Sequence, residues 1–390
     1  MVADTGPHMA ARLAEIQPFR VMELLARARE LEAAGRSIVH MEIGEPDFGT
    51  PEPVAEAARA ALTAGRTHYT PAGGLPQLRE AIAGFYAERY GVSVAPERVV
   101  VTPGASGALL LALGTLLNPG DEVLLADPGY PCNRHFVRFL EGRPVPVPVG
   151  PDQRYQLDAA AVAEHWGGRT VAAMVGSPSN PTGTVATAAE QAALAAAVRE
   201  RGGVLLADEI YHGLTYGGEA ATALAADRDA LVINSFSKYF GMTGWRLGWL
   251  VAPEAYAKEA EKLAQNLFIA APTVSQHAAV AAFSAENMAI LESRRQAFAE
   301  RRDFLLPQLR RLGFRVPAEP EGAFYIYADC SAFSTDSRAF CQRLLEEAGV
   351  AVTPGLDFGD YEPDTHLRFA YTNSLENLAE GVRRLEGFLA

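Results

Sequence analysis

The stretch Ser235-Phe-Ser-Lys-Tyr-Phe-Gly-Met-Thr-Gly-Trp-Arg-Leu-Gly248 places one amine, two serine hydroxyls and one guanidinium close together. Glycines interrupt the stretch, so its backbone can approach a ligand closely. Lys238 can form a Schiff base with a carbonyl group. Ser235, Ser237 and Arg246 can donate hydrogen bonds to a phosphate. The stretch therefore indicates a binding site for a phosphorylated aldehyde.

Two more polar motifs follow short apolar runs, as expected at the ends of buried strands. Asn180 lies in a Pro- and Gly-rich turn after the run 170–175, and Asp208 directly follows the run 203–207. Open α/β sheets bind ligands outside the carboxyl ends of their parallel strands. A buried acidic residue there needs a positive partner, such as a protonated pyridine nitrogen. Each motif alone is also typical of an ordinary strand-to-helix turn.

The spacing of these motifs makes their combination more specific. Asn180, Asp208 and Lys238 are 28 and 30 residues apart. This spacing suits successive strand-crossover units, which bring all three residues to one edge of a sheet. Farther upstream, small residues from Gly104 to Gly107 stand between an apolar run and a helix-like run. They predict a helix whose N-terminus can bind phosphate.

Composition limits the possible classes of function. The chain has 390 residues, enough for two domains, and a net charge of -13, which argues against nucleic acid as a partner. No run of eighteen apolar residues is present, so we expect no membrane span. The three cysteines, Cys132, Cys330 and Cys341, have no metal-binding spacing. They indicate reduced thiols in the cytoplasm and no metal site.

Local patterns predict several helices and one segment foreign to the fold. Residues 186–199, 254–263 and 289–312 have helical composition, and the last is long enough to link two domains. Residues 1–8 show no periodicity and precede a second methionine, Met9, so we interpret them as a tag remnant.

Taken together, these motifs resemble those of the class I (class I/II) pyridoxal-phosphate-dependent aminotransferases. These are fold type I enzymes of the aspartate aminotransferase superfamily. The resemblance extends from about Ile16 to the end of the chain. Its motifs are Gly44-Glu-Pro-Asp-Phe48, Thr67-His-Tyr-Thr-Pro71, Gly104-Ala-Ser106, Ser177-Pro-Ser-Asn-Pro-Thr-Gly183, Asp208-Glu-Ile-Tyr211, the stretch 235–246, Gly322-Ala-Phe-Tyr325 and His366-Leu-Arg-Phe369.

The resemblance implies an α/β fold of two domains. A large pyridoxal-phosphate-binding domain, residues 50–285, would contain a mostly parallel seven-stranded sheet sandwiched by helices. A smaller α+β domain would combine the N-terminal segment 1–49 with residues 286–390. The resemblance also implies a homodimer with shared active sites, because Tyr69 would reach the cofactor phosphate in the neighbouring subunit.

Roles for individual residues also come from the resemblance. Lys238 would hold pyridoxal 5'-phosphate as an internal aldimine and later act as the catalytic base. Asp208 would keep the ring nitrogen protonated. Asn180 and Tyr211 would hydrogen-bond the ring's phenolic oxygen, and Tyr130 would stack on the ring. The phosphate would be held by Gly104, Ala105, Ser106, Ser235, Ser237 and Arg246.

The substrate would be bound through its carboxylate. The resemblance implies that Arg368 clamps this group with two hydrogen bonds, assisted by Asn180 and the main chain of Gly44. Dicarboxylate-specific members of the subgroup place a lysine where this chain has Ser106, so we expect aspartate to be disfavoured. Four apolar side chains suggest an apolar pocket, although interface or core packing would explain them equally well: Ile16, Phe19, Phe268 and Ile269.

We therefore predict a ping-pong aminotransferase, through a Lys238 aldimine, that acts on a neutral or aromatic L-amino acid and a 2-oxo acid, either 2-oxoglutarate or pyruvate. Two alternatives remain open: a carbon-sulfur β-lyase of the same fold, which would release pyruvate and ammonia without an acceptor, and an aspartate-type aminotransferase. A transcription regulator of the same fold is disfavoured, because fewer than fifty residues precede the predicted large domain and they are not basic.

Overall fold

The central element of the molecule is a seven-stranded sheet. The computed structural model describes residues 9–18 and 20–390. The strand order is β2-β8-β7-β6-β5-β3-β4, and β8 runs antiparallel to both of its neighbours while the others are parallel. The expected mostly parallel seven-stranded sheet is thus confirmed. Its strands are β2 (Val99–Thr102), β3 (Glu122–Asp127), β4 (Arg143–Pro148), β5 (Thr170–Gly176), β6 (Val204–Asp208), β7 (Leu231–Ser235) and β8 (Gly248–Val251).

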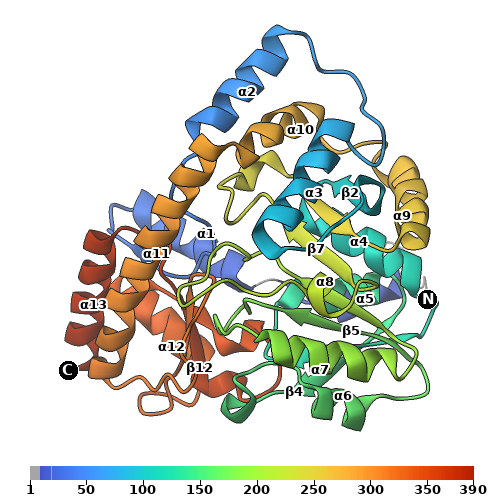
Figure 1. Cartoon of the computed structure of the whole chain (residues 1–390). Helices are drawn as coiled ribbons and strands as arrows, with labels where there is room; N and C mark the ends of the chain where they lie inside the picture. The colour runs from blue at the N-terminus through green and yellow to red at the C-terminus, as the bar shows by residue number, and fades with distance from the viewer. Residues whose placement is uncertain (1–8, 19) are drawn as a thin grey trace, which may run out of the picture.

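Helices cover both faces of this sheet (Figure 1). Successive strand residues point to opposite faces, and β2 shows this directly. Val99 and Val101 pack in one hydrophobic cluster, whereas Val100 packs in the other. The short apolar runs in the sequence are therefore strands buried on both sides. The helices from the first half of the chain are α1 (Arg20–Ala33), α2 (Glu52–Thr63), α3 (Pro76–Tyr90), α4 (Gly104–Leu116), α5 (Pro131–Phe139), α6 (Ala159–His165) and α7 (Ala188–Arg199).

The predicted helices are present, and their ends have local causes. The helix expected over residues 186–199 begins two residues later, at α7, because Thr187 forms a capping box with Glu190. The helix expected from residue 289 begins earlier, at Ala285, because the side chain of Ser284 accepts a hydrogen bond from Asn287 N. The remaining helices are α8 (Ala223–Ala226), α9 (Glu254–Leu267), α10 (Thr273–Val280), α11 (Ala285–Leu312), α12 (Ser337–Arg343) and α13 (Leu375–Leu389).

The helix α11 runs from the side of α10 to a second group of elements, where it packs beside α13 (Figure 1). That group holds a three-stranded sheet in the order β11 (Thr353–Pro354), β12 (His366–Ala370) and β9 (Tyr325–Asp329). It also contains the pairing of β1 (Val39–His40) with β10 (Val350–Ala351). The segment before the large sheet thus joins elements from the end of the chain.

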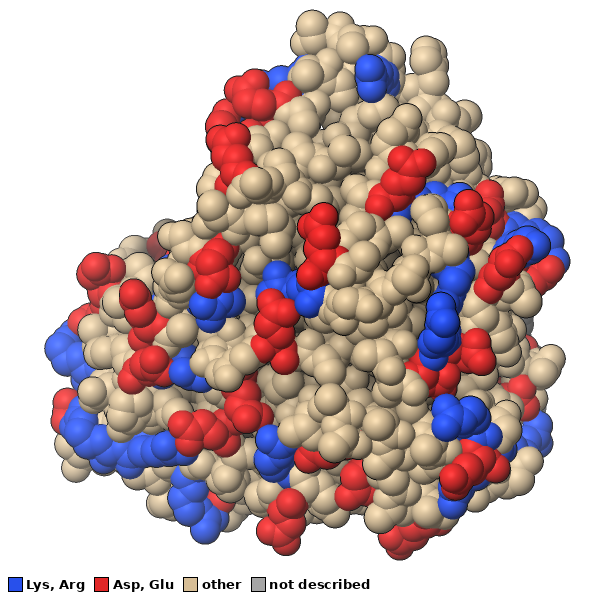
Figure 2. Space-filling view, in the orientation of Figure 1, with Lys and Arg blue, Asp and Glu red and all other residues tan. Residues whose placement is uncertain are grey.

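The surface shows no strong segregation of charge on the face drawn in Figure 2, where acidic and basic side chains are interspersed. None of the helices within residues 9–18 and 20–390 is long and apolar enough to cross a membrane. Over the same residues, no group of three or more His, Cys, Asp or Glu side chains is placed to hold a metal ion. The interpretation of residues 1–8 as a tag remnant concerns residues outside the described part.

Candidate active site

The parallel strands bring the main predicted residues to one edge of the large sheet. Asp208 is the last residue of β6, and its register partners are Gly176 at the end of β5 and Ile233 in β7. Asn180 and Lys238 follow the ends of β5 and β7 by a few residues. The spacing seen in the sequence therefore corresponds to three neighbouring strand ends.

Lys238 is the amine at this edge. Its Nζ donates a hydrogen bond to the carbonyl oxygen of Gly44 at 2.6 Å. Burial lowers the pKa of Lys238 to about 8, although the Glu45 carboxylate acts in the opposite direction. A lysine with a pKa near ambient pH has a substantial neutral fraction, which is the form that attacks a carbonyl and accepts a proton.

Asp208 is a buried carboxylate near this amine. Its Oδ1 accepts a hydrogen bond from Ile210 N at 3.2 Å. Burial raises the pKa of Asp208 to about 6, partly offset by that hydrogen bond and by the charge of Lys238. Burial also raises the pKa of the adjacent Glu209 to about 8, against hydrogen bonds from Ala223 N and the Thr222 hydroxyl. A buried carboxylate such as that of Asp208 is best stabilised by a cationic partner.

Arg368 lies in β12 and reaches the same edge from the smaller sheet. Its Nη1 donates to Asn180 Oδ1 at 2.9 Å, and its Nη2 donates to the carbonyl oxygen of Glu42 at 2.5 Å. The guanidinium carbon lies 4.3 Å from the ring centre of Tyr325 and 4.9 Å from that of Phe358. Its Nε is buried and has no hydrogen-bond partner among the described residues. The guanidinium is thus held by hydrogen bonds through Nη1 and Nη2, while the buried Nε donor remains available.

Tyr325 is a site residue to which the sequence analysis gave no role. Its hydroxyl lies 2.8 Å from the hydroxyl of Tyr211. A Cβ atom on Gly44 would lie 1.8 Å from the Tyr325 hydroxyl oxygen, so only glycine fits at position 44. Tyr325 therefore contacts Tyr211, Arg368 and Gly44 together. The signal was available in the Gly322-Ala-Phe-Tyr325 motif.

A cradle of hydroxyl, guanidinium and amide donors lies at the other end of the site. Ser235 Oγ donates to Ser237 Oγ at 3.0 Å, and Arg246 Nη1 donates to Ser237 Oγ at 3.3 Å. A Cβ atom on Gly104 would come within 2.5 Å of Arg246 Nη2. Ala105 and Ser106 follow Gly104 in the first turn of α4. A helix N-terminus, two hydroxyls and a guanidinium form a donor set that fits a phosphate.

Close backbone packing holds this cradle together. A Cβ atom on Gly248 would lie 2.7 Å from Ala105 N and 2.8 Å from the carbonyl oxygen of Asn234. Gly248 thus lets β8 run against the start of α4 and the end of β7. Gly248 ends the stretch quoted first, but its sequence context gives it no individual role, because a glycine in a strand can also mark a bulge or a bend.

Two aromatic residues with predicted roles lie in different environments. Tyr130 precedes α5 and lines a pocket together with Asn180, Asp208 and Tyr211. Tyr69, in contrast, is 81% exposed and is not among the residues that line this pocket within one chain. Of the apolar residues mentioned above, Ile269 is also exposed, Ile16 and Phe268 are partly buried, and Phe19 lies outside the described residues.

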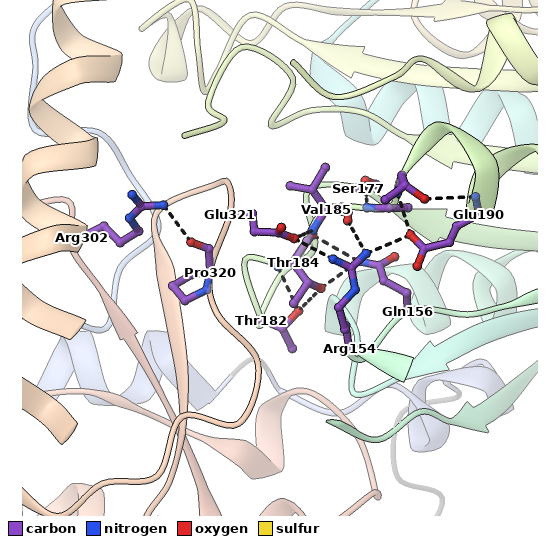
Figure 3. Close-up of polar contacts among 12 residues, drawn as sticks. Arg154, Gln156, Ser177, Thr182, Thr184, Val185, Glu190, Arg302, Pro320 and Glu321 are labelled. Carbon is purple, nitrogen blue, oxygen red and sulfur yellow. Dashed lines mark hydrogen bonds and ion pairs between the residues drawn. The ribbon is translucent and has the colours of Figure 1, made fainter. Parts of the chain in front are cut away.

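The turn that carries Asn180 is braced by side chains (Figure 3). Gln156 Nε2 donates to Thr184 Oγ1 at 2.8 Å, and the hydroxyls of Thr184 and Thr182 lie 2.9 Å apart. Ser177 Oγ accepts from Ala186 N at 2.9 Å. These contacts hold Asn180 in place for Arg368.

A buried lysine, a buried carboxylate, a cluster of hydroxyl and guanidinium donors and a buried arginine at the edge of such a sheet are typical of pyridoxal-phosphate enzymes of fold type I. The family model for aminotransferase class I and II matches residues 36–385. This chain therefore belongs to the class I and II aminotransferases. It is a pyridoxal-phosphate-dependent enzyme.

Similar proteins include several named aminotransferases. The chain is 41% identical to a valine–pyruvate aminotransferase of Mycobacterium tuberculosis, over 96% of this chain and 97% of that protein. It is 38% identical to an aspartate/prephenate aminotransferase of Thermus thermophilus, over 96% and 97% of the two chains. Among solved structures, an aminotransferase from Mycobacterium tuberculosis matches with a TM-score of 0.95 and 41% identity, over 98% and 99% of the two chains.

Proposed function

We propose that this aminotransferase moves an amino group from a neutral or aromatic L-amino acid to 2-oxoglutarate or pyruvate. The two substrates would use one site in turn, which gives ping-pong kinetics. Arg368 is the observation that carries the proposal. Its guanidinium lies against the rings of Tyr325 and Phe358 and donates a hydrogen bond to Asn180, and a planar guanidinium suits an α-carboxylate.

The residues at the site fit pyridoxal 5'-phosphate. Asp208 is a buried carboxylate that needs a cationic partner, and the donors around Arg246 suit a phosphate. When bound, the cofactor supplies an electron-withdrawing ring that stabilises negative charge at the substrate α-carbon. We assign its binding to Lys238, Asp208, Asn180, Tyr211, Tyr130, Gly104, Ala105, Ser106, Ser235, Ser237 and Arg246, with Tyr69 contributed by a second subunit.

The proposed roles follow from the environment of each side chain. Lys238 Nζ takes the proton from the substrate α-carbon, and its pKa of about 8 suits proton transfer near neutral pH. The carbonyl oxygen of Gly44 orients this amine. Asp208 keeps a proton on the ring nitrogen through its negative charge. Tyr211 and Asn180 would hold the ring by hydrogen bonds to its phenolic oxygen.

The substrate class is supported by charge and by one relative. Ser106 stands where a dicarboxylate-specific enzyme of the subgroup would carry a lysine, so no cation is supplied at that position for a second carboxylate. The relative with 41% identity is named as a valine–pyruvate aminotransferase. An aspartate-type aminotransferase is the second candidate, because the relative with 38% identity is named for aspartate and prephenate.

We also propose a homodimer with shared active sites. Tyr69 is 81% exposed, and Leu267 and Ile269 are 53% and 52% exposed. Thr273 Oγ1 donates to the carbonyl oxygen of His68 at 2.8 Å, which joins the segments that carry these apolar side chains. Exposed apolar residues gathered in this way favour an interface.

The domain boundaries and the location in the cell are proposals as well. We propose a large domain of residues 50–285 and a small domain of residues 1–49 and 286–390, in line with the pairing of β1 and β10. A cytoplasmic location is supported by the three cysteines, none of which forms a disulfide.

A panel of single amino donors tests the proposal. Valine, leucine, phenylalanine, aspartate and glutamate are each assayed with pyruvate and with 2-oxoglutarate, and kcat/KM is compared. We expect the neutral and aromatic donors to exceed aspartate by at least about tenfold. A preference for aspartate would support the second candidate. Release of pyruvate and ammonia from a sulfur amino acid without an acceptor would indicate a β-lyase.

A further inference from the structure

The guanidinium of Arg154 joins two regions that are far apart in the sequence, residues 185–190 and Glu321 (Figure 3). Its Nη1 donates to Glu321 Oε2 at 3.0 Å. Its Nη2 donates to Glu190 Oε2 and to the carbonyl oxygen of Val185, both at 2.9 Å. Glu190 belongs to α7, Val185 to the end of the Asn180 turn, and Glu321 to the chain just before β9. One side chain thus ties the turn after β5 to the approach to the smaller sheet.

The backbone at this position is unusual. Arg154 and Tyr155 both adopt left-handed conformations, with φ of 52° and 56°, although neither is glycine. Such residues cost free energy and persist only where the surrounding structure holds them. The ring of Tyr155 packs edge-on against that of Tyr327 in β9, with the centroids 5.8 Å apart. Two consecutive strained residues therefore contact Glu321 and Tyr327.

Glu321 and Tyr327 lie before and after Tyr325 in the sequence. Its hydroxyl meets Tyr211 at 2.8 Å, and its ring lies beneath the Arg368 guanidinium. The same segment is tied to the Asn180 turn, because Glu321 N and Gly322 N both donate to the carbonyl oxygen of Gly183, at 2.9 and 2.8 Å. A shift of this segment would move Tyr325 relative to Arg368.

We propose that Arg154 is a positioning residue for substrate capture. By holding Glu321 against the Asn180 turn, Arg154 fixes Tyr325 beneath Arg368 and keeps the guanidinium aligned for a carboxylate. This inference rests on the proposed role of Arg368 as the carboxylate-binding residue. Arg154 itself is not among the residues that line the pocket with Tyr130, Asn180 and Asp208.

The ion pairs of Arg154 are partly exposed to solvent, and this allows a positioning role to be distinguished from a contribution to overall stability. The side chains of Arg154, Glu190 and Glu321 are 35%, 48% and 45% exposed. Ion pairs with this much exposure add little to the free energy of unfolding. Loss of Arg154 is therefore expected to act on carboxylate binding and to leave the melting temperature nearly unchanged.

The test measures binding of a carboxylate that cannot react. Isovalerate is titrated into the pyridoxal-phosphate-loaded protein and its dissociation constant is read from the absorbance of the cofactor. The variants are Arg154→Ala, Arg154→Lys and Glu321→Gln, with Glu190→Gln as the matched control, since that change leaves the contacts to Glu321 and Val185 in place. Cofactor affinity and melting temperature are measured for each protein.

We expect Arg154→Ala to weaken isovalerate binding by about fivefold, the upper range for an exposed ion-pair network. Glu321→Gln should show a smaller loss in the same direction, and Arg154→Lys should restore only part of the affinity, because an ammonium lacks the planar fork. Glu190→Gln should change the dissociation constant by less than about twofold. Cofactor affinity and melting temperature should stay close to those of the unmodified enzyme.

An Arg368→Ala variant, measured in parallel, distinguishes failure of the inference about Arg154 from failure of the proposed role of Arg368. If Arg368→Ala weakens isovalerate binding and Arg154→Ala does not, the inference about Arg154 is wrong and the proposed function stands. If Arg154→Ala lowers cofactor affinity and melting temperature as strongly as carboxylate binding, its role is structural and the inference is also overturned. If Arg368→Ala leaves binding unchanged, the carboxylate site is wrongly assigned and the inference falls with it.

Discussion

The hydroxyl pair formed by Tyr211 and Tyr325 offers a sharp test of the site geometry. Tyr325→Phe removes one hydroxyl and keeps the ring beneath Arg368. The Tyr211 hydroxyl, in a side chain that is only 4% exposed, then loses its partner at 2.8 Å. A buried hydroxyl left without a hydrogen bond costs about 1–3 kcal/mol. We therefore expect the free energy of unfolding of the cofactor-free enzyme to fall by that amount.

The same strand supplies the control. Tyr327 lies two residues along β9, and its hydroxyl is buried without a hydrogen-bond partner in the described structure. Tyr327→Phe removes a hydroxyl that forms no bond, so stability should stay the same or rise slightly. Urea unfolding of both variants at one protein concentration measures the difference. Equal losses in the two variants, or a larger loss for Tyr327→Phe, would refute the geometry proposed around Tyr211.

Three other expectations follow from named contacts. Arg368→Ala should lower kcat/KM for amino donors by at least about 30-fold while cofactor affinity stays within about twofold, because a buried charged partner is lost; steady-state kinetics would contradict this if KM and kcat were unchanged. Burial raises the pKa of Glu209 to about 8, so the native state keeps a proton that the unfolded state has lost. The free energy of unfolding should then fall as pH rises from about 5 to 8, and Glu209→Gln should flatten that fall; an identical pH profile would count against a buried, protonated Glu209. Asp47→Asn should weaken the two hydrogen bonds, at 2.7 and 2.9 Å, from Arg301 and loosen the segment that carries Gly44. The rate at which Lys238 reacts with an amine reagent is measured against pH, and the midpoint of that curve should shift. An unchanged midpoint would show that this ion pair does not position the lysine.

The large sheet and its ligand edge could be predicted because their signals are local. Asp208 and Lys238 each follow a buried apolar run, and parallel strands necessarily align their carboxyl ends. The helix that begins at Gly104 was predictable from the small residues at its start and from its position after a strand. These features need only periodicity and turn chemistry. The family resemblance added the role of each residue.

Contacts between distant segments could not be predicted in the same way. The motif Gly322-Ala-Phe-Tyr325 points to Tyr325 as a site residue, but nothing in it specifies Tyr211, 114 residues away, as the neighbour of its hydroxyl. Arg154 adopts a left-handed backbone conformation although it is not glycine, so its residue type does not predict that conformation. Gly248 matters because β8 runs against α4. All three depend on how segments far apart in sequence meet.

The absorbance spectrum of the pyridoxal-phosphate-loaded enzyme tests the central claim most directly. It is recorded before and after the addition of single amino acids, with no 2-oxo acid present and with Lys238→Ala as the control protein. We expect neutral or aromatic amino acids to convert the aldehyde form of the cofactor to its amine form, and we expect no such conversion in the control. An unchanged spectrum with every amino acid, or release of pyruvate without conversion of the cofactor, would contradict the assignment of this chain as an aminotransferase for such donors.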